Sequence, residues 1–176
     1  MNSFGQKLRF STFGESHGVA LGCILDGVPA GLKIDEAYIQ SELDRRKPWQ
    51  SNITTQRKED NSFEILSWTF EWKTTGHPIM MIVYNENQKS RDYTNIKDLF
   101  RPNHADLTYH QKYDGIRDYR WWWRSSRRET VSRVLAWELA KQYLKEKRGV
   151  AILWFTKQSW KYKVKNVYYS LIEQNN

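Results

Sequence analysis

The sequence is poor in cysteine, in glycine and in long apolar runs. Cys23 is the single cysteine, which excludes an internal disulfide, and its apolar surroundings favour a place in the core over a nucleophilic role. No apolar run approaches the roughly 20 residues of a membrane-spanning helix. The N-terminus alternates polar and apolar residues, unlike a secretory signal peptide. We therefore expect a soluble, cytoplasmic protein.

Several common site patterns are also missing. No glycine-rich Walker or dinucleotide motif is present, and no spacing of histidine, cysteine, aspartate and glutamate indicates a bound metal ion. Glycine itself is scarce, because the 176 residues include nine glycines and as many tryptophans. This tryptophan content is the compositional anomaly of the chain.

Basic charge, in contrast, is abundant. The formal net charge is +8, and residues 141–165 carry eight lysines or arginines against the single acid Glu146. Such a chain suits an anionic partner, which can be a nucleic acid, a lipid surface or a small polyanionic substrate.

The hydrophobic pattern predicts both strands and helices within one domain. A first helix is expected at 36–46, with Asp35 as its N-cap and with Ile34 and Ile39 in the positions of a hydrophobic staple. A second helix is expected at 127–147, and residues 85–118 form a long polar stretch with short elements. Strands are expected at 7–13, 20–25, 63–70, 79–84 and 150–155.

An arginine-rich stretch at 117–130 precedes the second helix. Ser126 and Glu129 have the spacing of a capping box, and a serine-rich turn before a helix leaves backbone N–H groups that attract phosphate. We interpret residues 124–128 as an anion site. The arginines and tryptophans at 120–124 also allow a second interpretation, a stacking surface for nucleic acid or a membrane-interface patch.

Two histidines lie in turns where acid–base chemistry is possible. His17 lies between glycines, and His104 has Asp106 two residues further on. Each is either a solvated turn residue or a general acid in an accessible pocket. Arg45 and Arg46 end the first helix, where cations favour the helix dipole, and as a functional cluster they would bind an anion.

Taken together, these motifs resemble those of chorismate synthases over nearly the whole chain. Two blocks are highly specific, G-E-S-H-G at 14–18 and R-S-S-R-R-E-T at 124–130. Further matching blocks are L-G-C-I-L-D-G-V-P-A-G-L (21–32), L-D-R-R-K-P (43–48), T-T-G-H-P-I (74–79), R-P-N-H-A-D (101–106) and Q-K-Y-D-G-I-R-D-Y-R (111–120).

The resemblance implies an α+β fold in which helices are sandwiched between β-sheets, with residues 1–176 forming the N-terminal portion of a single domain. It implies a lyase of aromatic amino acid biosynthesis that eliminates phosphate from 5-enolpyruvylshikimate 3-phosphate to give chorismate. The cofactor is reduced FMN, with NADPH as the candidate reductant. The implied partners are this small-molecule substrate and further copies of the chain in a homotetramer, without nucleic acid or membrane.

Site residues follow from the same motifs. His17 is expected to be the acid that serves the leaving phosphate, and His104 to protonate the reduced flavin. The other expected site residues hold anions: Arg124, Ser125, Ser126 and Arg46 for the cofactors, and Arg45 and Arg128 for the substrate.

The chain also departs from the family pattern. Asn52 replaces a basic residue, Asn103 replaces a glycine, and Arg127 replaces an alanine. The match covers about the first half of a family chain, and the other half supplies further flavin contacts, an acidic catalytic residue and more arginines. We expect little or no activity from a chain that ends at Asn176.

Tryptophan stands at many positions where the family has glycine. These positions are Trp49, Trp68, Trp72, Trp121, Trp122, Trp123 and Trp137, and Trp154 and Trp160 fit the same pattern. Indoles at 121–123 would block a flavin pocket, because each has roughly 150–250 Å² to bury. We hypothesise that a codon which the organism reads as glycine is written here as tryptophan. If the tryptophans are real, a basic, aromatic-rich binding module for nucleic acid or anionic membrane is the alternative function.

Overall fold

The computed structural model describes residues 2–47, 61–86, 99–116 and 126–170. The chain divides into two compact units, Met1–Ala140 and Lys141–Asn176. The first unit combines a sheet with helices, which confirms the α+β class.

A five-stranded antiparallel sheet forms the base of the first unit. Its strands pair in the order β1-β2-β3-β7-β4. Their bounds are β1 Ser3–Gly5, β2 Arg9–Gly14, β3 Ala20–Asp26, β7 Ile79–Tyr84 and β4 Phe63–Ile65. The expected strands at 7–13, 20–25 and 79–84 are confirmed, whereas the expected strand at 63–70 is interrupted after Ile65.

One face of the central strands carries the core. Cys23 lies opposite Met81 in the β3–β7 register, and both side chains are fully buried. Burial raises the pKa of the Cys23 thiol to about 12, so the thiol stays protonated at neutral pH. Cys23 is therefore a core residue, as the sequence indicated. The same face includes the buried side chains Leu21, Leu25, Ile79 and Val83.

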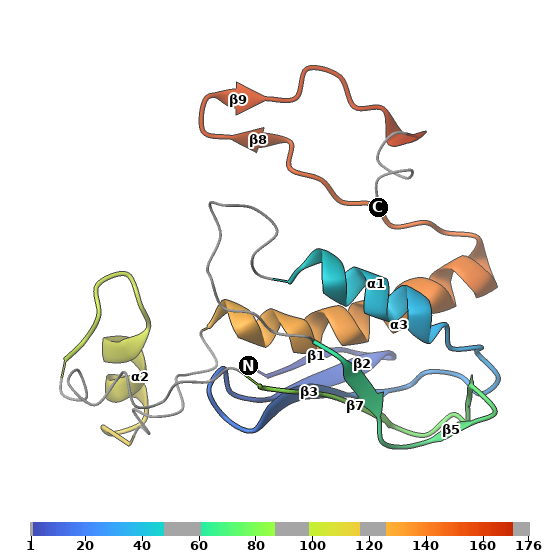
Figure 1. Ribbon diagram of the computed structural model, residues 1–176, viewed down its shortest axis with the longest axis horizontal. Coiled ribbons are helices and arrows are strands. Elements are labelled where there is room, and N and C mark those ends of the chain that lie inside the picture. Colours follow the sequence, from blue (N-terminus) through green and yellow to red (C-terminus); the bar gives the residue numbers. More distant parts are fainter. Residues whose placement is uncertain (1, 48–60, 87–98, 117–125, 171–176) are drawn as a thin grey trace. The chain divides into compact units, whose positions relative to one another are not determined.

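Two helices pack on this face in the first unit (Figure 1). Helix α1 spans Glu36–Arg45, and the Asp35 carboxylate caps it by accepting the N–H of Tyr38 at 3.0 Å. Helix α3 spans Thr130–Arg148, and the 3₁₀ turn η2, Arg127–Glu129, precedes it. Both predicted helices are thus confirmed, and they bury regularly spaced apolar residues: Ile39 and Leu43 from α1, and Val131, Leu135 and Leu139 from α3.

The start of α3 differs in detail from a capping box. The Ser126 hydroxyl accepts the N–H of Arg128 at 3.3 Å, one residue earlier than the box requires, because the first turn is a tighter 3₁₀ turn. The Glu129 carboxylate accepts a hydrogen bond from Arg133 Nε at 3.0 Å, one turn further along. Ser126 therefore confirms the predicted N-cap, with a different N–H as its partner.

The remaining elements are short. Hairpin β5–β6 pairs Thr69–Phe70 with Lys73–Thr74, and helix α2 spans Asp106–Lys112. In the second unit, β8 (Gln158–Ser159) pairs with β9 (Tyr162–Lys163). The expected strand at 150–155 is wrong: the apolar run has no strand partner, and most of its side chains are exposed. Within the described ranges, no helix is long and apolar enough to cross a membrane.

Candidate active site

The strand register brings two separate polar segments to one end of the sheet. Gly14, the last residue of β2, pairs with Leu21 near the start of β3, so the 15–19 turn lies at this end. Ala20 pairs with Tyr84, the last residue of β7, which places Asn85 beside the turn. The turn and Asn85 are 70 residues apart in sequence, and the sheet alone makes them neighbours.

His17 occupies this turn. Its Nδ1 lies 2.9 Å from the hydroxyl of Ser16, which is almost fully buried. A serine hydroxyl can donate to Nδ1 or accept from it, so this contact suits either tautomer of the ring. Ser16 therefore orients the His17 ring.

Asn85 ties the His17 turn to the start of α3. Its Nδ2 donates to the carbonyl oxygens of Glu15 and Gly18, at 2.9 and 2.8 Å, so it holds the turn on both sides of His17. Its Oδ1 accepts a hydrogen bond from Arg128 Nε at 3.1 Å. Its backbone N–H donates to the carbonyl of Val19 at 3.0 Å. One half-buried amide thus connects two segments that the sequence motifs predicted separately.

Arg128 is buried at the start of α3. Besides its bond to Asn85, its Nη1 donates to Oδ1 of Asn61, which lies just before β4 and is also buried. A buried guanidinium is tolerated when amide or carboxylate oxygens accept its hydrogen bonds. Arg128 is therefore held rigidly next to the His17 turn.

Arg46 reaches the same region from the end of α1. Its Nη2 donates to the carbonyl of Arg127 at 3.0 Å and so joins the end of α1 to the turn before α3. Burial lowers the pKa of Arg46, but a guanidinium stays cationic at neutral pH. Arg45 instead forms an ion pair on its own helix with Glu42, at 2.9 and 3.1 Å. We call the group around the turn the sheet-end cluster, defined as Ser16, His17, Asn85, Arg128, Ser126 and Arg46.

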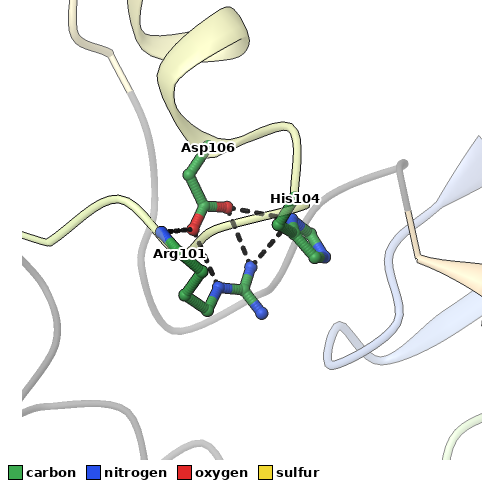
Figure 2. Close-up of polar contacts among 3 residues, drawn as sticks. All are labelled: Arg101, His104 and Asp106. Carbon is green, nitrogen blue, oxygen red and sulfur yellow. Dashed lines mark hydrogen bonds and ion pairs between the residues drawn. The ribbon is translucent and has the colours of Figure 1, made fainter.

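His104 belongs to a second cluster, formed with Arg101 and Asp106 at the start of α2 (Figure 2). Its Nδ1 lies 3.0 Å from Asp106 Oδ1 and 3.0 Å from Arg101 Nη2. Arg101 also donates to Asp106 through Nε and Nη2, each at 2.8 Å, and through its backbone N–H at 3.0 Å. We call these three residues the α2 cluster.

The Asp106 carboxylate in the α2 cluster is ionised. Burial alone would raise its pKa, but the hydrogen bonds and the charge of Arg101, together with His104, hold the pKa below its usual value. An ionised carboxylate only accepts hydrogen bonds, whereas the Arg101 guanidinium only donates them, and both lie 3.0 Å from Nδ1 of His104. The α2 cluster therefore holds the His104 ring through Nδ1.

The structure brings together most of the predicted site residues that it describes. His17, Ser126, Arg128 and Arg46 belong to the sheet-end cluster, His104 to the α2 cluster, and Arg45 to a pair on α1. Arg124 and Ser125 lie outside the described residues, as do Trp49 and Trp121–Trp123.

Three contacting residues were missed from the sequence, namely Asn61, Asn85 and Arg101. Asn85 and Asn61 lie in ordinary polar stretches after and before a strand, where nothing marks them out. Arg101 could have been found, because the R-P-N-H-A-D block places an arginine and an aspartate on either side of His104.

Comparison with known proteins identifies the family of this chain. The family model "Chorismate synthase" matches residues 8–175. The chain is 67% identical over 146 residues to chorismate synthase of Aliarcobacter butzleri, covering 83% of this chain and 40% of that protein. It is 66% identical over the same length to chorismate synthase of Sulfurimonas denitrificans, also covering 40% of it. The chain therefore spans about two fifths of the length of these relatives.

A solved structure gives the same result. The crystal structure of a chorismate synthase matches with a TM-score of 0.56 and 36% sequence identity, over 80% of this chain and 35% of that chain. The similarity thus covers both sequence and fold.

Proposed function

We propose that this chain, which belongs to the chorismate synthase family, carries the proton-donating and anion-binding part of a chorismate synthase active site. The reaction is the elimination of phosphate from 5-enolpyruvylshikimate 3-phosphate to give chorismate. The observation that carries this proposal is the sheet-end cluster, in which the His17 turn and Arg128 share Asn85 as a common partner. The comparisons lend no support to a binding module for nucleic acid or membrane.

The chemistry of the reaction matches the cluster. The substrate carries a phosphate and two carboxylates, and phosphate leaves as an anion. Guanidinium groups bind such anions through paired N–H donors, and Arg46 and Arg128 bring two of them to the cluster. An acid near the leaving oxygen lowers the barrier to departure, and His17 can take that role.

The residues of the cluster also fit a phosphate-bearing cofactor. Ser126 caps the start of a helix, and Arg46 is anchored on the backbone of the same turn. Both groups favour an anion at this position. These two residues would hold the phosphate of FMN, together with Arg124 and Ser125 of the same motif. Reduced FMN, when bound, supplies transient electron density for an elimination that is redox-neutral overall.

His104 has a distinct role in this proposal. Asp106 and Arg101 hold the ring through Nδ1, and the imidazole would accept or deliver a proton at the flavin. NADPH is proposed as the reductant, a homotetramer as the assembly, and the cytoplasm as the compartment, all from family membership. The relatives' greater length implies that further site residues lie beyond the segment matched here.

A direct assay tests the proposal. The protein is purified from cells that make it and given 5-enolpyruvylshikimate 3-phosphate with reduced FMN under anaerobic conditions. From the full-length protein of those cells we expect chorismate and inorganic phosphate in equal amounts, and neither product with oxidised FMN alone. Phosphate release without chorismate, or no turnover with reduced FMN, would contradict the proposal.

A matched pair of variants tests the site. His17→Ala should strongly reduce turnover, whereas His77→Ala should leave it unchanged, because His77 precedes β7 and the Asn85 that holds the His17 turn follows the other end of that strand. Equal losses in the two variants would remove His17 from the mechanism.

A further inference from the structure

Asn85 follows β7 and connects two segments of the candidate site. It makes three side-chain hydrogen bonds that join the 15–18 turn to Arg128. The two carbonyls that it holds, on Glu15 and Gly18, lie on either side of His17, so they determine where the imidazole points. A polar residue that bridges two site segments can set their relative position without touching the substrate.

We propose that Asn85 is a positioning residue that fixes His17 relative to Arg128. This rests on the proposed function, in which the histidine must face an anion held by arginine. Its amide group suits the task because Nδ2 donates to the turn while Oδ1 accepts from the guanidinium. Asn85→Asp keeps an oxygen that can accept from the Arg128 guanidinium but loses the N–H donors to the turn. This substitution therefore separates the donated hydrogen bonds from the accepted one.

Asn85→Asp and Asn85→Ala test this role in the purified chain by NMR of the histidine rings. We expect the His17 ring signals and their pH titration to move in both variants, while those of His77 stay unchanged. Asn166→Asp is the matched control, because it makes the same chemical change in an exposed side chain of the second unit. Thermal unfolding of each variant identifies those that remain folded.

Unmoved His17 signals in a folded Asn85 variant would overturn the positioning role. The NMR result does not depend on turnover. Failure of the proposed function would instead appear in the assay of the unsubstituted protein, so the two failures can be distinguished. If the assay succeeds, both Asn85 variants should lower kcat more than they raise KM, since the proton donor is displaced rather than the anion site.

A separate observation concerns tryptophan. Seven of the nine glycines have φ in the left-handed region. Among the residues that the structure describes, seven others also have positive φ: Asn61, Asn103 and Asp114, which are types that tolerate it, Glu71, and three tryptophans, Trp68, Trp72 and Trp160. A bulky side chain in this region is a true outlier, because its Cβ crowds the backbone.

Two of these tryptophans occupy the glycine positions of tight hairpin turns. In β5–β6, Phe70 pairs with Lys73, so the loop is Glu71 and Trp72, and both have positive φ. This is the pattern of a type I′ turn, whose second residue is typically glycine. The carbonyl of Trp72 accepts the N–H of Ile34 at 2.8 Å, which ties the turn to a neighbouring segment.

The second hairpin repeats the observation. In β8–β9, Ser159 pairs with Tyr162, so the loop is Trp160 and Lys161, with positive φ at Trp160 alone. This is the pattern of a type II′ turn, in which glycine takes the first position. Trp68 is held in a similar way, because its carbonyl accepts both the backbone N–H and the hydroxyl of Thr75.

None of the three indoles offsets this strain by burial. Trp68 is 53%, Trp72 58% and Trp160 84% exposed. An indole in water contributes little to stability, whereas glycine meets the backbone requirement without any steric conflict. Fold and composition thus agree that these three positions suit glycine.

We infer that positions 68, 72 and 160 are translated as glycine in the cell, through a codon that the printed sequence renders as tryptophan. One reassigned codon explains three independent turns, the tryptophan excess and the scarcity of glycine together.

Peptide mass spectrometry of the protein purified from its own cells tests this inference. We expect glycine at all three positions, and the same digest reads the other six tryptophan positions. Tryptophan at any one of the three overturns the inference. In chains made recombinantly, Trp68→Gly, Trp72→Gly and Trp160→Gly should each raise the unfolding temperature. Trp137→Gly should lower it, because this residue lies within α3, where glycine is unfavourable.

Discussion

The sheet-end cluster and the α2 cluster each orient one histidine, but they do so by different means. The backbone on both sides of His17 is held by the amide of Asn85, which is far away in sequence and also binds Arg128, while the His17 ring contacts the hydroxyl of the adjacent Ser16. His104 is held by Arg101 and Asp106, within six residues of chain and mainly by charge. The first arrangement depends on the whole fold, whereas the second is local. Substitutions should therefore show whether each histidine depends on contacts made by the fold or on a local ion pair.

The largest expected effect is on turnover at the two histidines. His17→Ala should lower kcat by about 10²–10⁴-fold, the usual contribution of a general acid. His104→Ala should also lower it, and in addition change how turnover depends on flavin concentration, because this residue is proposed to act at the flavin. Steady-state assays at several FMN concentrations make the comparison. A flavin-dependent defect in His17→Ala alone would reverse the two assignments.

The second prediction concerns Arg128. Arg128→Ala removes a buried guanidinium and leaves the Asn61 and Asn85 oxygens without this donor, so it should destabilise the chain by about 2–3 kcal/mol. Urea unfolding at pH 7 measures this change. Arg128→Lys is the control, since an ammonium cannot reproduce the paired geometry and should recover only part of the loss. Full recovery would show that charge, rather than shape, matters here.

The third prediction concerns Asp106 and pH. Its pKa is lowered in the folded chain, so its contribution to stability is present above the unfolded value near 3.9 and is lost as pH falls through the folded value. Asp106→Asn should cost about 2 kcal/mol at pH 7, because it removes a buried charge partner of Arg101. Once the pH falls below the folded pKa of Asp106, the free energies of unfolding of the two chains should converge. Unfolding at pH 7 and at low pH checks this, and an equal difference at both values would contradict it.

The smallest expected effect separates two neighbouring arginines. Arg46 bonds to the backbone of Arg127 and so links α1 to the sheet-end cluster, whereas the half-exposed Arg45 pairs within its own helix. Arg46→Ala should therefore weaken binding of inorganic phosphate several-fold. Arg45→Ala should change stability by less than about 1 kcal/mol and leave phosphate binding unchanged. Calorimetric titration of phosphate into both variants decides between them.

The difference between local contacts and contacts made only by the fold explains which features could be predicted from the sequence. Asp35, the Ile34–Ile39 staple and the apolar run at 79–84 are local signals, and the elements they predict are present. The α2 cluster is equally local, and the spacing of His104 and Asp106 pointed to it. Asn85 and Asn61 carry no local signal, because only the sheet register brings them to His17 and Arg128. The wrong strand at 150–155 shows the same limit, since an apolar run forms a strand only where a partner strand pairs with it.

The central claim is that the sheet-end cluster receives the anionic substrate beside His17. Titration of 5-enolpyruvylshikimate 3-phosphate into the purified protein, followed through the NMR signals of its four histidines, tests this most directly. We predict that the His17 signals move with the binding curve, and that Arg128→Ala shifts this curve to higher concentration by about tenfold or more, as for a lost charged hydrogen bond. Substrate binding that leaves the His17 signals unmoved would contradict the account.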